Sequence, residues 1–345
     1  MCGFAGSFGN LNFKLNDRKI FSSLKHRGPD SFGKCKIGMC VMYHSRLTII
    51  GNSKHGLQPI TNEKNTTTLV YNGEIYNWKE LRNNFFPDEK NNIKSDTQIL
   101  LRLFEKFGIS FVNKLRGIFS FVIYSNKDKK IYLVRDRFGV KPLFYYKNNK
   151  NIFFATEIKS LLAMNLKKKL NLSVFKTYLM EAKLCQNNKT FFRNINSLEP
   201  ATIYEISNFG EKKTKYWNLK NNEDHLDQDE TEDLVIDSIK SNFIADTEVS
   251  VALSSGMDSS IIAYELLSSK KKLRSYSFGY INKKYNEIDD IKKNFKNKKN
   301  LVQNFKIMKS KDMLDKLQKA IYFFETPLGG LGTLSSFDLF NKVRQ

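Results

Sequence analysis

The first 205 residues consist mainly of short apolar runs of strand length that are separated by turn residues. Examples are CVMYHSRLTII, GIFSFVIYS and KIYLVRD. Such runs are typical of antiparallel sheets, whose neighbouring strands need only short connections. The clearest helix is predicted for SDTQILLRLFEKFG, in which Ser95 and Gln98 have the spacing of a capping box and Gly108 fits the helix stop. We therefore predict an α+β fold that is mostly antiparallel sheet, with a few helices.

The composition of the sequence and the elements that it predicts change after residue 205. Residues 206–228 are polar and charged, which indicates a linker. Beyond them, ETEDLVIDSIKSNF has helical spacing, with Asp229 and Glu232 placed as a capping box, and EVSVAL is predicted to form a buried strand. A loop, SSGMDSS, and an apolar helix, IIAYELL, follow. We predict a domain at 2–205, a linker at 206–228, and an α/β domain at 229–345.

Composition excludes several classes of protein. The formal charge is +22, but the lysines are spread over loops and mixed with Asn, so we expect no specific nucleic-acid binding. No apolar run approaches the roughly 20 residues that span a bilayer, and the start lacks a secretory signal pattern. We expect a cytoplasmic protein without a membrane partner. The four cysteines show no CxxC spacing, so we predict neither a zinc site nor a disulfide framework.

Two short segments of the first domain allow more than one interpretation. In LVYNGEIYN, Asn72 and Gly73 fit a tight hairpin turn, but the Asn72 amide and the Gly73 N–H could also form an oxyanion hole in a rigid turn. Asp96 lies in the first turn of the predicted helix, where the dipole favours a carboxylate. It could also hold a ligand ammonium.

The chain begins MCGFAG, and removal of Met1 would place a thiol and a free α-amine on Cys2. In the second domain, SSGMDSS follows a predicted strand and precedes a helix. The loop either allows close packing of helix and strand or surrounds an anion with N–H groups and hydroxyls. It lacks the Gly-Lys-Ser/Thr ending of a Walker loop, and Asp258 lies inside it, which favours pyrophosphate release from ATP with Mg²⁺.

Several ordered motifs carry a family resemblance. They are MCGFAG, HRGPD at 26–30, HSRL at 44–47, YNGEIYN at 71–77, SD at 95–96, RDRFGVKPLFYY at 135–146, ATEIKSLL at 155–162 and LSSGMDSS at 253–260. In this order they strongly resemble glutamine-hydrolysing asparagine synthetases. The resemblance implies an N-terminal-nucleophile hydrolase sandwich, with antiparallel sheets between helices, as a class II glutamine amidotransferase domain. An α/β ATP-pyrophosphatase domain follows, of which the chain contains the N-terminal part.

The resemblance also implies a role for each matching residue. Cys2 would attack the glutamine amide with its own α-amine as general base. The other predicted residues of this site are Arg46 for the glutamine α-carboxylate, Asp96 for its α-ammonium, Asn72 and Gly73 for the oxyanion, and Leu47 and Glu74 as further glutamine-binding residues. Arg27 and Asp30 would lock the loop over the site. In the second domain the predicted residues are Leu253 and Phe278 for adenosine, Ser254, Gly256, Asp258 and Ser259 for pyrophosphate, and Glu325 in the acceptor region.

The complete reaction implied by the resemblance converts aspartate to asparagine with glutamine, ATP and Mg²⁺, in an enzyme that could be a homodimer. Three departures from the family pattern matter. Ser255 replaces a usual glycine, and the chain ends at NKVRQ, before the family's second Ser-Gly-Glu-Gly-x-Asp-Glu stretch. We therefore expect a truncated chain with an inactive synthetase half. The segment ETPLGGLGTLSSF also departs from aspartate-using relatives. Alternatives are an amidotransferase for another acceptor, such as a polysaccharide sugar acid or a β-lactam precursor, and a non-catalytic binding module.

Overall fold

The structure is a computed structural model that describes residues 1–10, 14–49, 55–148, 151–184, 187–219, 227–269 and 272–343. The chain divides into two compact units, Met1–Asn221 and Asn222–Gln345. Each unit is described by itself.

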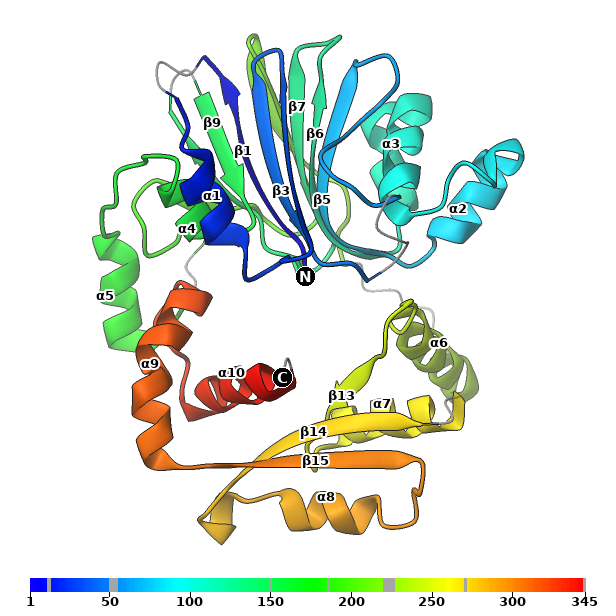
Figure 1. Cartoon of the computed structure of the whole chain (residues 1–345), viewed down its shortest axis with the longest axis vertical. Coiled ribbons are helices and arrows are strands. Elements are labelled where there is room, and N and C mark those ends of the chain that lie inside the picture. The colour runs from blue at the N-terminus through cyan, green and yellow to red at the C-terminus, as the bar shows by residue number, and fades with distance from the viewer. Residues whose placement is uncertain are drawn as a thin grey trace. The chain divides into compact units, whose positions relative to one another are not determined.

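The described part of the first unit contains two six-stranded antiparallel sheets that face each other (Figure 1). One sheet has the order β10-β8-β9-β1-β3-β2, with β1 (Gly3–Gly9), β2 (Ser31–Ile37), β3 (Cys40–Arg46), β8 (Phe144–Lys147), β9 (Asn151–Ala155) and β10 (Ile195–Ser197). The other has the order β12-β11-β7-β6-β5-β4, with β4 (Ile60–Thr61), β5 (Thr67–Ile75), β6 (Gly117–Ser125), β7 (Lys130–Arg135), β11 (Thr202–Ser207) and β12 (Gly210–Lys215).

Helices cover the outer faces of both sheets (Figure 1). Beside the first sheet lie α1 (Asp17–Leu24), α4 (Ile158–Leu162) and α5 (Leu172–Glu181), and beside the second lie α2 (Trp78–Phe85) and α3 (Asp96–Phe107), with short 3₁₀ turns at Pro87–Glu89 and Gly108–Lys114. This layering confirms the predicted sandwich of antiparallel sheets between helices.

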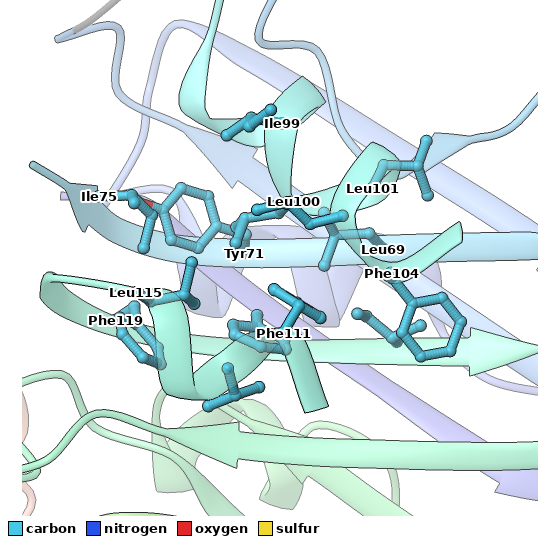
Figure 2. Close-up of a cluster of buried hydrophobic side chains, with 14 of the residues drawn as sticks. Leu69, Tyr71, Ile75, Ile99, Leu100, Leu101, Phe104, Phe111, Leu115 and Phe119 are labelled. Atoms are coloured by element: carbon cyan, nitrogen blue, oxygen red, sulfur yellow. The ribbon is translucent and has the colours of Figure 1, made fainter. Parts of the chain in front are cut away.

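Successive side chains of β5 pack into different layers of the sandwich and so hold these layers together. Leu69 and Tyr71 pack toward α3, whereas Val70 packs between the sheets, as expected from the two-residue period of a strand. Figure 2 shows Tyr71 and Ile75 close to Ile99 and Leu100 of α3. Full burial of a side chain of this size stabilises a fold by about 1.5–3 kcal/mol. The core therefore fixes the start of α3 against the end of β5.

The helix predicted from SDTQILLRLFEKFG is confirmed as α3. The Ser95 hydroxyl accepts a hydrogen bond from the Gln98 N–H, and Gly108 ends the helix with a φ of 60°. Both signals are local, so the sequence is sufficient to place them.

Two local predictions for the first unit are wrong. Asn72 and Gly73 form no turn, because they lie inside β5 and pair with Ser120 and Phe119 of β6. Strand β12 lies beyond residue 205, where the linker is predicted to begin, and it pairs with β11. All six residues of β12 are exposed, which explains the polar sequence of this edge strand.

In its described residues, the second unit has a three-stranded parallel sheet of β13 (Ser250–Ala252), β14 (Leu273–Tyr280) and β15 (Leu301–Met308). Its helices are α6 (Gln228–Ser241), α7 (Met257–Ser269), α8 (Ile288–Asn294), α9 (Ser310–Phe324) and α10 (Leu331–Val343), with a 3₁₀ turn at Lys283–Tyr285. The expected strand, loop and helix correspond to β13, 253–256 and α7. The capping box at Asp229 is wrong, because Asp227 caps α6 by accepting a hydrogen bond from the Glu230 N–H.

Candidate active site

Met1 and Cys2 line a small cavity in the first unit. Figure 1 shows the N-terminus at one end of the sandwich. Its open volume is about 40 Å³. All seven residues predicted to bind or hydrolyse glutamine line it: Cys2, Arg46, Leu47, Asn72, Gly73, Glu74 and Asp96. Met1, Ile49, Gly56, Gln58, Tyr71, Thr97 and Lys141 complete the lining. The fold therefore brings together side chains that are up to 94 positions apart in the predicted set.

Cys2 precedes β1 and is held from two sides. The Arg27 Nε donates a hydrogen bond of 2.8 Å to the Cys2 carbonyl, and the Leu47 N–H donates to the Cys2 Sγ at 3.4 Å. Burial raises the pKa of the Cys2 thiol. The pKa of the adjacent α-amine, that of Met1, is lowered to about 6, first by burial and then by Arg27 and Lys141. The site therefore combines a protonated thiol with an amine that is neutral at pH 7.

Glu157 supports this arrangement, although the sequence assigns it no individual role. Its carboxylate is 5% exposed and bonds with His26 at 2.9 Å, with Arg27 at 2.8 Å, and with Lys159. These groups outweigh the cost of burial and lower the pKa of Glu157 to about 2. ATEIKSLL, which contains Glu157, and HRGPD therefore act together to orient Arg27 toward Cys2.

Asn72 and Gly73 reach the cavity from the middle of a strand. Asn72 is 1% exposed, and its Nδ2 has no hydrogen-bond partner within the described part of the chain. A buried donor without a partner is costly, which points to a ligand acceptor. A Cβ at Gly73 would lie 2.3 Å from the Ile118 carbonyl, so only glycine fits this close approach to β6.

Two opposite charges line the same cavity. Arg46 ends β3 and is 4% exposed, and its guanidinium lies so close to Gly56 that a Cβ there would be 2.3 Å from the Nη2. Asp96 begins α3, and its carboxylate accepts hydrogen bonds from the Tyr71 hydroxyl and the Thr97 N–H, both at 2.8 Å. Burial raises the pKa of Asp96, while these hydrogen bonds oppose the change. The pair can bind the two charged ends of an amino acid.

Asp30 holds the segment that follows Arg46. Its carboxylate accepts a hydrogen bond of 2.7 Å from the Thr48 N–H, and its own N–H donates to the Arg46 carbonyl. This contact keeps Leu47, whose N–H meets the Cys2 sulfur, at the edge of the cavity.

The second unit has its own cavity, of about 160 Å³. Of the predicted nucleotide-binding residues, Leu253, Ser254 and Phe278 line it, together with aromatic residues that include Tyr276 and Tyr280. Gly256 and Ser259 bond to Ser254 within the loop, the two serine hydroxyls being 2.8 Å apart. Asp258 lies in the first turn of α7, and Glu325 caps the end of α9. Neither of these two carboxylates is among the described residues that line this cavity.

Ser255, which stands where the family usually has a glycine, fits the loop without backbone strain. It is not among the described residues with a positive φ. Its N–H and hydroxyl each donate a hydrogen bond of 2.9 Å to the Glu287 carboxylate, which also lines this cavity.

The described residues contain no group of three or more His, Cys, Asp or Glu side chains placed to hold a metal ion. Among the same residues, no helix is both long and apolar enough to cross a membrane.

Comparison with known proteins gives two family matches. Residues 1–217 match the model of the glutamine amidotransferase domain, and residues 230–345 match that of asparagine synthase. The chain is 29% identical to asparagine synthetase (glutamine-hydrolysing) 1 of Bacillus subtilis (strain 168), over 95% of this chain and 53% of that protein. It is 33% identical to asparagine synthetase (glutamine-hydrolysing) 2 of the same strain, over 76% of this chain and 38% of that protein.

A third relative has a different name. The chain is 32% identical to amidase chyE of Penicillium rubens, over 69% of this chain and 36% of that protein. The chain therefore spans about half the length, or less, of these curated relatives. The family matches confirm the resemblance stated from the motifs. Because the amidotransferase model covers more than half of its residues, the chain belongs to the glutamine amidotransferase family.

Proposed function

We propose that the first unit hydrolyses glutamine to glutamate and ammonia, with Cys2 as nucleophile. The observation that carries this proposal is the unpartnered Asn72 Nδ2 in the same cavity as the Cys2 thiol. A donor in this position can stabilise the oxyanion that forms when a thiol attacks an amide. The test is glutamate release from L-glutamine by the purified chain. An activity no greater than that of Cys2→Ala would overturn the proposal.

The first step is a proton transfer from the Cys2 thiol to its α-amine, through a water molecule. Burial raises the pKa of the Cys2 thiol, and it lowers the pKa of the terminal amine that Met1 places in the same cavity. We therefore expect the Cys2 amine, once Met1 is removed, to be neutral while the thiol still carries its proton. The sulfur attacks the side-chain carbonyl carbon of glutamine, and the oxyanion is held by the Asn72 amide and the Gly73 N–H. The protonated amine then returns its proton to the leaving ammonia. Water hydrolyses the thioester to glutamate and restores the thiol.

Met1 must be removed for this chemistry, since the base is the α-amine of Cys2. Met1 lines the cavity and donates no other group to the reaction. We predict that intact-mass spectrometry of active protein shows a chain beginning at Cys2. A substitution Gly3→Ala is not suitable as a control, because a Cβ there would lie 3.0 Å from Arg27. Active protein that retains Met1 would contradict the proposed base.

Glutamine recognition is assigned to Arg46 for the α-carboxylate and Asp96 for the α-ammonium, with Leu47 and Glu74 beside them. Arg46→Lys is expected to raise KM about tenfold or more, because a lysine cannot form the bidentate contact of a guanidinium. Asp96→Asn is expected to have a similar effect. Steady-state kinetics with glutamine provide the measurement, and Arg116→Lys on the exposed surface is the matched control. Unchanged KM values in both site variants would place the substrate elsewhere.

For the second unit, we propose the N-terminal part of an ATP-pyrophosphatase domain, the domain that the sequence predicts at 229–345. Leu253 and Phe278 would border adenosine, and Ser254, Gly256, Asp258 and Ser259 would hold pyrophosphate, with Mg²⁺ entering bound to ATP. In the whole reaction, ammonia would amidate an ATP-activated aspartate, near Glu325, to form asparagine. The proposal includes a cytoplasmic location and a homodimer. In a complete homologous chain, AMP formation that requires aspartate and is lost when the residue matching Asp258 is changed to Asn would support this assignment.

A second candidate is the amidation of a different acceptor. It is favoured by the segment ETPLGGLGTLSSF, which departs from aspartate users, and by the similarity to a protein named as an amidase. Competition among carboxylate acceptors in the ATP-dependent assay distinguishes it from asparagine formation, whereas glutamine hydrolysis is common to both.

A further inference from the structure

The motif RDRFGVKPLFYY has no role in the chemistry described so far, yet its backbone is held unusually firmly. Asp136 is 1% exposed, and its carboxylate accepts hydrogen bonds from the N–H groups of Phe138, Val140 and Lys141, at 3.1, 2.9 and 2.9 Å. The same carboxylate accepts a hydrogen bond from the Phe119 N–H of β6. One carboxylate therefore fixes the loop after β7 to the neighbouring strand.

The Arg135 guanidinium binds two backbone carbonyls of the same loop. Its Nε donates to the Lys141 carbonyl at 2.8 Å, and its Nη2 donates to the Gly139 carbonyl at 2.6 Å. Gly139 has a φ of 67°, which favours glycine. Both backbone groups of Lys141 are thus paired, one with Asp136 and one with Arg135. We call this arrangement the Arg135–Asp136 clamp.

The side chain held by this clamp points into the glutamine cavity. Lys141 lines the cavity with Cys2, and its Nζ lies 3.4 Å from the Met1 Sδ. Removal of Met1 takes away that contact and exposes the α-amine of Cys2, a residue that lines the same cavity as Lys141. Burial lowers the pKa of Lys141, but the nearby carboxylates of Glu74 and Asp136 favour its charged form.

Four groups from different elements act on the α-amine of Met1 before its removal: the Cys2 thiol, Glu74 of β5, Arg27 after α1, and Lys141. The charge of Arg27 is matched by Glu157, with which it forms an ion pair of 2.8 Å. Lys141 forms no ion pair within the part of the chain that the structure describes. Of the two cations, Arg27 therefore has a direct ion pair, whereas the carboxylates near Lys141 act on it only from a longer distance.

We propose that Lys141 acts as an electrostatic positioning residue, whose ammonium, placed by the Arg135–Asp136 clamp, keeps the α-amine of Cys2 neutral. The inference rests on the proposed glutamine hydrolysis. A nearby positive charge disfavours protonation of an amine, and only the neutral amine can accept the thiol proton. Lys141 thus acts through the base and needs no contact with glutamine.

The sign of the expected pH effect follows from this role. The terminal amine of Met1 shows the direction of the effect, because burial lowers its pKa and the charges of Arg27 and Lys141 lower it further. Loss of the lysine charge is expected to raise the pKa of the Cys2 amine, by about one unit, so that fewer molecules carry a neutral base at low pH. Activity should therefore fall about five- to tenfold at and below the wild-type midpoint and change less than about twofold about two pH units above it.

The experiment compares Lys141→Met and Lys141→Gln with Lys141→Arg, which keeps the charge, and with Lys176→Met, an exposed lysine on α5, as the matched control. The first measurement is the pH profile of kcat/KM for glutamine. The second is the ¹⁵N chemical shift of the α-amine in protein labelled with [¹⁵N]cysteine, followed from about pH 5 to pH 9. Thermal melting identifies any variant that does not fold, and the glutamine variant provides a second charge-free side chain.

In both charge-free variants the acid limb of the profile and the ¹⁵N titration should move to higher pH together, while the arginine variant and the control keep the wild-type midpoints. An unchanged amine pKa in folded Lys141→Met and Lys141→Gln would overturn the proposal, even if their activity is uniformly lower. Absence of glutamine hydrolysis in the wild-type protein would instead overturn the proposed function. The ¹⁵N titration needs no substrate, so it tests Lys141 in that case as well.

Discussion

Cys2→Ala is expected to lower glutamine hydrolysis to the background rate, because it removes the sulfur that forms the thioester. Folding should change little, since the hydrogen bonds of the Cys2 sulfur with described residues are two long contacts with Leu47, of 3.4 and 3.5 Å. The measurements are glutamate release and the thermal midpoint of the same preparation. The variant must be shown by mass spectrometry to have lost Met1, so that the missing group is the thiol alone.

Cys35→Ala is the matched control for this variant. Cys35 lies on β2, is half-buried, and has a free thiol, but it does not line the glutamine cavity. It should retain wild-type activity. Substantial glutamate release by Cys2→Ala would mean that another group is the nucleophile, whereas an equal loss in Cys35→Ala would indicate a structural effect.

Asn72→Leu is expected to lower kcat by about 10²–10³, the usual effect of removing one oxyanion donor. Its stability should not fall, because the Asn72 Nδ2 has no partner among the described residues, and an apolar side chain of similar size removes a buried unpaired donor. Loss of activity without loss of stability therefore distinguishes a donor to the substrate from a structural amide. Kinetics and thermal melting together provide the measurement.

Asn77 lies at the other end of YNGEIYN, and both atoms of its side-chain amide have hydrogen-bond partners. Its amide donates to the Lys114 carbonyl at 3.0 Å and accepts from the Arg116 N–H at 2.9 Å. Asn77→Leu should therefore lower the thermal midpoint and leave kcat near the wild-type value. If Asn72→Leu is destabilised as much as Asn77→Leu and keeps its kcat, the Asn72 amide has a structural role and the oxyanion assignment is wrong.

Local signals in the sequence were sufficient for several parts of the fold. Helix α3 has its cap at Ser95 and its stop at Gly108 as predicted, because capping depends on residues within one turn. The same reasoning failed for α6, where Asp227 and Asp229 are both acidic and only the backbone path decides which of them is the cap. Short apolar runs between turn residues also predicted the antiparallel sheets, and the family resemblance implied that they form a sandwich.

The motifs, taken with the family resemblance, named seven residues that line one cavity. The sequence by itself therefore determined the type of fold and named half of the described residues that line this cavity. Tertiary structure decided how these residues are used. Asn-Gly has the signature of a turn, but β6 pairs with it and converts it into a strand whose amide faces the cavity unpaired.

Two charged residues show most clearly which contacts the sequence alone could not predict. Glu157 and Lys141 lie in motifs that the sequence displays, but their partners are more than 100 positions away, at Arg27 and Met1. A side chain's charge is visible in the sequence, whereas its effect on an amine or a guanidinium depends on distance and burial. Only the closed sandwich, with the Arg135–Asp136 clamp and the Glu157 ion pairs in place, brings those charges to the nucleophile.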